Sequence, residues 1–232
     1  LMKPVNGVVN AVTSHRKSLL LMGMWLSRPD RAGPMPVMST AASSRTTAGD
    51  PSVFPVLRSS VFFDHAAVSP LPAPVADAMR SFITTWSEQG PQLAGYDVVR
   101  DLRVAAAQLC QVEADEVAIV PNTSTGLATV AGGLALGEGD VVVTTSIEFP
   151  ANLNVWMDRA RLGLRVVPVE PRGDGFLVHD DDIVAAMREA FSASRGTRLL
   201  AISHVQFSTG QRHDIARLAA VSHELGGLVC VD

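Results

Sequence analysis

The chain has 232 residues, of which 47% are hydrophobic and 18% are charged, and its formal net charge at pH 7 is −4. This composition suits one globular domain with an apolar core and a tail, and without a basic patch we expect no nucleic-acid partner. Its cysteines, Cys110 and Cys230, predict neither a disulfide framework nor a cysteine-based metal site. We therefore expect a reducing cytoplasm and no metal.

Residues 1–52 are predicted to be a disordered or mis-annotated N-terminal tail. The apolar run from Leu19 to Leu26 follows basic residues, as in a secretory signal. It is too short to span a membrane and no small-residue cleavage site follows it, so we expect no membrane partner. Residues 27–52 are rich in Pro, Ser, Thr, Gly and Ala, which is typical of an unpacked segment, and Met38 precedes a plausible start.

Residues 53–97 are predicted to form the N-terminal segment of a small domain and a connecting helix. Pro74 opens a helical run that reaches about Gln89. One face of this run is apolar and carries Val75, Met79, Phe82, Ile83 and Trp86.

Strand and helix patterns alternate from residue 98, where a helix to Cys110 begins. Continuous apolar runs predict strands at 117–120, 141–144, 164–169, 199–205 and 228–231. Helical stretches lie at about 124–136, 151–162, 180–194 and 212–225. Strands without polar alternation are typically buried on both faces, so we predict an α/β fold with a mainly parallel sheet flanked by helices. Ligands bind such sheets beyond the C-terminal strand ends.

The segment after the first strand predicts a phosphate site. Thr123, Ser124 and Thr125 supply hydroxyl and backbone N–H groups at the start of a helix, where an anion is stabilised. The alternative is an ordinary helix N-cap, since Ser and Thr are preferred there.

Phe149 follows the second strand, where its ring could stack on a flat aromatic cofactor or pack in the core. Its neighbour Glu148 has the simpler interpretation of a charge at a helix start. After the fourth strand, His204 and Gln206 could face the ligand crevice. A histidine there is often structural, and Gln206 could instead cap a loop.

Asp232 follows the fifth strand. A carboxylate there is costly to bury unless a cation pairs with it, and a protonated pyridine nitrogen would serve. The alternative is an aspartate that caps the next element.

Taken together, these segments resemble the class V aminotransferase family of fold type I pyridoxal phosphate (PLP) enzymes. That family includes cysteine desulfurases, selenocysteine lyases, kynureninases and isopenicillin N epimerase-like proteins. The resemblance runs from Phe62 to Asp232, and Asp64 to Pro72 looks like the segment that approaches the substrate. It implies a PLP-transferase-like fold, with residues 98–232 as an incomplete large domain and part of a small N-terminal domain.

The resemblance also implies a function. PLP would be the cofactor, and an amino acid would be the small-molecule substrate for lyase, epimerase or transaminase chemistry through a Schiff base. Ser124 with Thr123 and the Thr125 backbone would hold the phosphate, Phe149 would stack on the pyridine, and Asp232 would pair with its nitrogen. The segment with His204 and Gln206 would lie beside the phenolic oxygen. The full-length protein would be a homodimer.

Several residues depart from the desulfurase pattern. Phe149 stands where desulfurases usually carry histidine, and Phe207 where they usually carry asparagine. Neither cysteine resembles their persulfide-carrying cysteine. The substrate and the reaction branch therefore stay open.

The chain's lysines are Lys3 and Lys17, and neither matches the family's Schiff-base lysine, which we expect beyond Asp232. The sequence therefore predicts a fragment without a catalytic residue, and an inactive truncated product or a binding fragment is the alternative. A nucleotide-binding domain and a hydrolase are not favoured, because the glycine-rich phosphate loops and the Gly-x-Ser-x-Gly elbow are missing.

Overall fold

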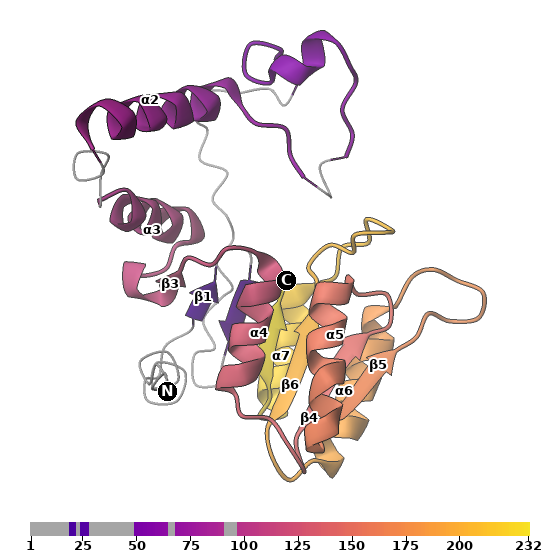
Figure 1. The fold of residues 1–232 in the computed structure, drawn as a ribbon. Coiled ribbons are helices and arrows are strands. Elements are labelled where there is room, and N and C mark those ends of the chain that lie inside the picture. Colours follow the sequence, from indigo (N-terminus) through magenta and orange to yellow (C-terminus); the bar gives the residue numbers. More distant parts are fainter. Residues whose placement is uncertain (1–18, 22–23, 28–48, 65–67, 91–96) are drawn as a thin grey trace. The chain divides into compact units, whose positions relative to one another are not determined.

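The computed structural model describes residues 19–21, 24–27, 49–64, 68–90 and 97–232 (Figure 1). The chain divides into two compact units, one formed by residues 1–37 with 106–232 and the other by residues 38–105. The first unit carries a sheet, and the second is helical. No helix among the described residues is both long and apolar enough to cross a membrane.

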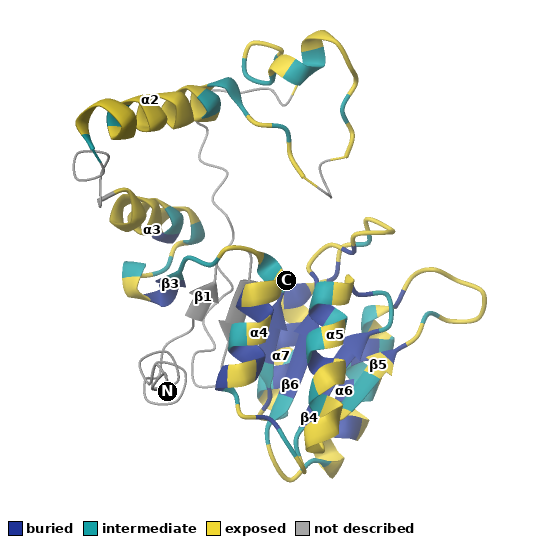
Figure 2. Ribbon diagram, in the orientation of Figure 1, coloured by how far each residue is buried: buried dark blue, intermediate teal, exposed yellow. Residues whose placement is uncertain are grey.

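The sheet of the first unit has the strand order β3-β1-β2-β7-β6-β4-β5. Strands β4, β5, β6 and β7 pair in parallel, which confirms the predicted mainly parallel sheet. The apolar runs of β4, β6 and β7 are almost entirely buried, whereas β5, at the end of the strand order, buries only Val169 (Figure 2). The five strands that the sequence predicts are β3 (Val117–Ala118), β4 (Val141–Thr145), β5 (Arg165–Val169), β6 (Arg198–Ile202) and β7 (Leu228–Val231).

Strand β6 is shorter than its prediction because the chain turns after Ile202. A bridge between Val205 and Arg212 forms a short antiparallel loop there. The apolar Val205 extended the predicted strand, although its side chain is exposed.

Two strands come from the predicted tail. β1 (Leu19–Leu21) and β2 (Met24–Ser27) are antiparallel to each other, β1 runs parallel to β3, and β2 runs antiparallel to β7. The pairing covers the edge of β7, whose backbone groups would otherwise lack partners. These residues form strands, whereas the sequence predicted a disordered or mis-annotated tail. The end of that tail at residue 52 stays a prediction.

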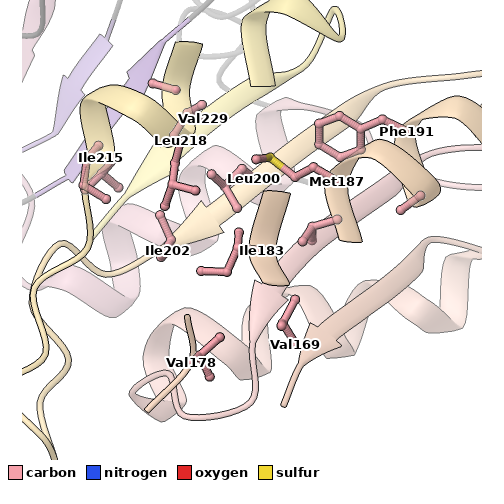
Figure 3. Packing of buried hydrophobic residues seen from close by; sticks show 14 of the residues in the cluster. Val169, Val178, Ile183, Met187, Phe191, Leu200, Ile202, Ile215, Leu218 and Val229 are labelled. Carbon is pink, nitrogen blue, oxygen red and sulfur yellow. The ribbon is translucent and has the colours of Figure 1, made fainter. Parts of the chain in front are cut away.

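Helices cover both faces of the sheet. Alternate strand residues point to opposite faces, so Val142 and Leu199 pack with α4 (Thr123–Gly133) and α5 (Pro150–Arg159). Val143 and Leu200 pack on the other face with α6 (Asp180–Ala193) and α7 (Ile215–Glu224). Figure 3 shows this second cluster, in which Ile183, Met187 and Phe191 of α6 lie against the strands. Two 3₁₀ turns, η3 (Ala114–Glu116) and η4 (Ala160–Leu162), complete the unit.

The second unit contains the 3₁₀ turn η2 (Pro55–Arg58) and α2 (Ala73–Gln89), and α3 (Asp97–Cys110) begins in it. The predicted helix to Gln89 is confirmed, and Gly90, with a φ of 83°, ends it. The predicted second helix is α3.

Candidate cofactor site

The C-terminal ends of β4, β6 and β7 bring the candidate residues to one edge of the sheet. Backbone bonds continue the pairing past the strands: the Asp232 amide donates to the Ile202 carbonyl at 3.0 Å, and the His204 amide donates to the Asp232 carbonyl at 2.9 Å. Asp232 and the segment that starts at Ser203 are therefore neighbours. The sequence predicted this proximity from the parallel order of the strands alone.

The start of α4 offers backbone amides and hydroxyl groups that can donate hydrogen bonds. Asn122 is the N-cap, and its side chain accepts a hydrogen bond from the Thr125 amide at 2.8 Å. The amides of Thr123 and Ser124 open the helix, where backbone N–H groups have no intrahelical partner. Ser124 and Thr125 are exposed and Thr123 is half-buried. The cap itself falls on Asn122, which the sequence analysis did not single out, and the following hydroxyls remain available for an anion.

Glu148 lies at the centre of a buried polar cluster. Its side chain is only 4% exposed, and its carboxylate accepts hydrogen bonds from three segments of the chain. The donors are Thr145 Oγ1 at 3.0 Å, Asn152 Nδ2 at 3.0 Å, Ser203 Oγ at 2.5 Å, the Ser203 amide at 3.1 Å and Gln206 Nε2 at 2.7 Å. No described ion pair involves Glu148. It is thus more than a charge at a helix start.

A spacing of four residues through the start of α5 was the signal that could have identified this cluster. Asn152 donates to Glu148, and Trp156 Nε1 donates to Asn152 Oδ1 at 3.2 Å. Glu148 precedes the helix, Asn152 and Trp156 lie on it, and all three are buried. Polar residues four and eight positions before a buried tryptophan indicate an inward-facing network.

Gln206 is a member of this network. It is 1% exposed, and its Nε2 donates to Glu148 and, at 3.3 Å, to Thr145 Oγ1. Because an ionised carboxylate only accepts, the amide nitrogen must face Glu148. This leaves Gln206 Oε1 buried and without a partner among the described residues. His204, by contrast, is exposed. Direct cofactor contacts by both residues stay predictions.

Phe149 and Phe207, which follow Glu148 and Gln206 in the sequence, form an aromatic pair. Phe149 is the N-cap residue of α5, and its ring lies edge-to-face with that of Phe207, with centroids 5.1 Å apart and planes at 88°. Their exposed fractions are 48% and 50%. Phe149 is therefore not a core residue, which was the alternative that the sequence left open. The pair presents apolar surface at the ligand-binding edge.

Asp232 holds its proton more tightly than an ordinary aspartate. Burial raises the pKa of its carboxyl, and the negative charge of Glu148 raises it further, while the Ser203 side chain partly offsets both. Burial and the same two carboxylates raise the pKa of Cys230, which makes this thiol unreactive. A positive charge placed beside Asp232 would reverse the shift at that residue.

A separate hollow of about 630 Å³ lies beside these residues and is lined by Arg172, Gly175, Phe176, Leu177, His179, Ser208 and Thr209. It contains none of the predicted site residues. We place the site at the hydrogen-bonded cluster, because specific polar groups converge there. Among the described residues, no group of three or more His, Cys, Asp or Glu side chains could hold a metal ion.

Comparison with known proteins places these features in one family. Residues 61–232 match the family described as Aminotransferase class-V. A probable cysteine desulfurase from Methanothermobacter thermautotrophicus is 29% identical over 184 residues, which cover 77% of this chain and 44% of that relative. A cysteine desulfurase from Klebsiella pneumoniae subsp. pneumoniae is 33% identical over 202 residues, covering 77% and 47%.

Solved structures give the same picture. The apo structure of a cysteine desulfurase from Thermococcus onnurineus NA1 superposes with a TM-score of 0.64 at 24% identity and covers 76% of this chain and 44% of its own. The cystine C-S lyase C-DES, in complex with its reaction product cysteine persulfide, gives 0.63 at 26% identity, covering 75% and 46%. The chain thus spans about half the length of the relatives it matches.

Proposed function

Because the chain belongs to the class V aminotransferase family of PLP-dependent enzymes, we propose that residues 117–232 carry the part of a PLP site that binds the phosphate and the pyridine ring. The activity of the whole protein is PLP-dependent lyase, epimerase or transaminase chemistry on an amino acid. We also propose that the active protein is a cytoplasmic homodimer, as the family resemblance implies.

One observation carries this proposal: a site for an anion and a site for a cation face the same edge of one sheet. The start of α4 offers amides and hydroxyls to an anion. Asp232, next to the buried Glu148, favours a cation because the two carboxylates repel each other. PLP carries a phosphate at one end and a protonated nitrogen in its ring, so the residues present fit the cofactor.

Each residue then has a defined task. Thr123 and Ser124 bind the phosphate together with the Thr125 hydroxyl, since the Thr125 amide already donates to Asn122, and Asp232 keeps the ring nitrogen protonated. Phe149 packs against the ring, but a hydrocarbon cannot transfer a proton, so this position contributes orientation only. When bound, PLP supplies an electron sink for the amino acid's Cα or Cβ.

Titration of the full chain with PLP and with pyridoxine 5′-phosphate, which lacks the aldehyde, tests the proposal. Calorimetry should show binding of both ligands. Asp232→Asn should weaken it about tenfold, the effect of roughly 1.4 kcal/mol. Asp181→Asn, at an exposed aspartate outside the cluster, is the matched control. Equal affinity of Asp232→Asn and the unaltered chain would contradict the assigned role.

A chain that binds the cofactor without catalysis should not fix it covalently. Residues 38–232 contain no lysine. Borohydride treatment of the PLP complex, followed by peptide mass spectrometry, should therefore find no PLP fixed to these residues. Stable label on any peptide of this range would contradict this expectation, because borohydride fixes only an imine and an imine requires an amine.

A further inference from the structure

Glu148 and Gln206 are joined by a hydrogen bond, and the residues that follow them, Phe149 and Phe207, are in aromatic contact. Each aromatic residue follows a member of the buried polar pair by one position. The loop after β4 and the loop after β6 are therefore joined twice, by a buried polar bond and by an aromatic contact one residue later. We call the buried set the Glu148 clasp, which comprises Thr145, Glu148, Asn152, Ser203 and Gln206.

The clasp depends on a charged acceptor. All five of its donor groups point at the two Glu148 oxygens. A glutamine at this position would keep the shape but place an NH₂ group against donors, and one side of the clasp would lose its partners. Gln206 would be most affected, because Glu148 is the charged acceptor that fixes the orientation of its amide.

The aromatic pair cannot fix itself. Both rings are about half exposed, so neither is held by surrounding core atoms. Edge-to-face contact requires a defined angle between the rings, and that angle depends on the backbone positions of both loops. The clasp lies immediately before each ring and supplies those positions.

We propose that Glu148 is a positioning residue: through its hydrogen bond to Gln206 it holds Phe207 in edge-to-face contact with Phe149, and so fixes the ring that packs on the cofactor. This inference rests on the proposed function for the identity of the ligand. The positioning itself is a property of the chain, so the two are tested separately.

A fluorine resonance measures the positioning without any ligand. With 4-fluorophenylalanine at position 207 of the full chain, the ring current of Phe149 shifts the ¹⁹F signal. Phe149→Leu defines the signal without the aromatic contact. Glu148→Gln should move the signal most of the way to that value. Glu116→Gln changes another buried glutamate, which lies in a capping box before β3, and should leave the signal in place.

A charge swap separates positioning from general stability. Gln206→Glu alone brings two carboxylates together and should also lose the ring-current shift. The double variant Glu148→Gln with Gln206→Glu restores a donor facing a carboxylate and should recover part of the shift. Thermal unfolding checks that each variant is folded. A double variant no better than either single change would overturn the inference.

Binding of pyridoxine 5′-phosphate links the clasp to the ligand. Phe207→Leu keeps an apolar side chain at an exposed position and therefore leaves folding intact. Both Phe207→Leu and Glu148→Gln should weaken binding about two- to tenfold, the range that an aromatic contact supports. Unchanged affinity in both, with the fluorine shift lost, would overturn the positioning role. An unaltered chain that binds no pyridoxine 5′-phosphate would overturn the proposed function, while the fluorine signal would still decide whether Glu148 positions Phe207.

Discussion

Two groups of carboxylates in the first unit contrast in their partners. In the strand-end group, Glu148 is buried, Asp232 is half-buried, and neither has a cationic partner among the described ion pairs. The α6 group, Asp180, Asp181 and Asp182, forms the first turn of its helix, and each member contacts a basic side chain. Asp180 contacts His213 Nδ1 at 2.6 Å, Asp181 pairs with Arg217, and Asp182 pairs with Arg172 at 2.6 Å.

This difference distinguishes structure from function. Acids at a helix N-terminus are stabilised by the helix dipole, and the arginine partners of Asp181 and Asp182 lower the pKa values of these two residues. The strand-end group is incomplete, and the pKa of Asp232 is raised. A cationic ligand would complete it. Acidic residues alone are therefore poor markers of a site, whereas unbalanced buried ones are informative.

The largest expected effect follows from removing Glu148. Glu148→Ala leaves its buried donors without an acceptor and should lower the free energy of unfolding by about 3–5 kcal/mol. Urea denaturation of the full chain measures the loss. Glu170→Ala, at an exposed glutamate after β5, is the control and should change little. A loss below about 1 kcal/mol for Glu148→Ala would show that the cluster is open to water.

His213 should have the next largest effect, because it is the buried member of the α6 group. Its ring is 2% exposed, and the neighbouring Asp214 amide also donates to Asp180, at 2.9 Å. His213→Ala removes a buried ring and a partner of Asp180, so we expect a loss of about 2–4 kcal/mol. His204→Ala, at an exposed histidine, is the comparison. Similar losses in both variants would contradict the assigned burial.

Replacement of Asp232 by asparagine should raise the stability of the fold in a pH-dependent way. Its folded-state pKa is raised, so ionisation of Asp232 opposes folding. The penalty is absent below the unfolded pKa of about 3.9, grows as the pH rises from there to the folded pKa, and is fully present above the folded pKa. Asp232→Asn should therefore raise the thermal midpoint at pH 7 and leave it unchanged in acid. A lower midpoint at pH 7 would show that the fold already supplies a cation.

Asp182 should show the smallest effect and the opposite sign. Its hydrogen bond with Arg172 lowers its pKa, so its contribution is present above about pH 3.9 and is lost as the pH falls through the folded pKa. Asp182→Asn should slightly lower the midpoint at pH 7, and the difference should vanish in acid. Because the pair is exposed, added salt should also reduce it. A salt-independent loss would indicate a buried contact.

The sequence predicted the architecture well because the relevant signals are local. Continuous apolar runs identified β4, β5 and β7, and helical spacing identified α2 and its end near Gln89, although the apolar side chains of α2 are exposed in the structure. The polar segment after Ile202 was harder, since Val205 continues an apolar pattern although its side chain is exposed. Pairing of β2 with β7 was not predicted, because strand partners are set by distant contacts.

By itself, the sequence determined the alternation of strands and helices, a helix start near Ser124 and the family to which the chain belongs. Each depends on residue types at fixed short spacings. Only the tertiary structure decided that Glu148 is buried, that Gln206 turns its amide inward and that Phe149 meets Phe207. These contacts join residues 55 to 58 positions apart, and they exist because β4 and β6 are neighbours in the sheet. Burial and partner choice depend on such neighbours, which no local pattern specifies.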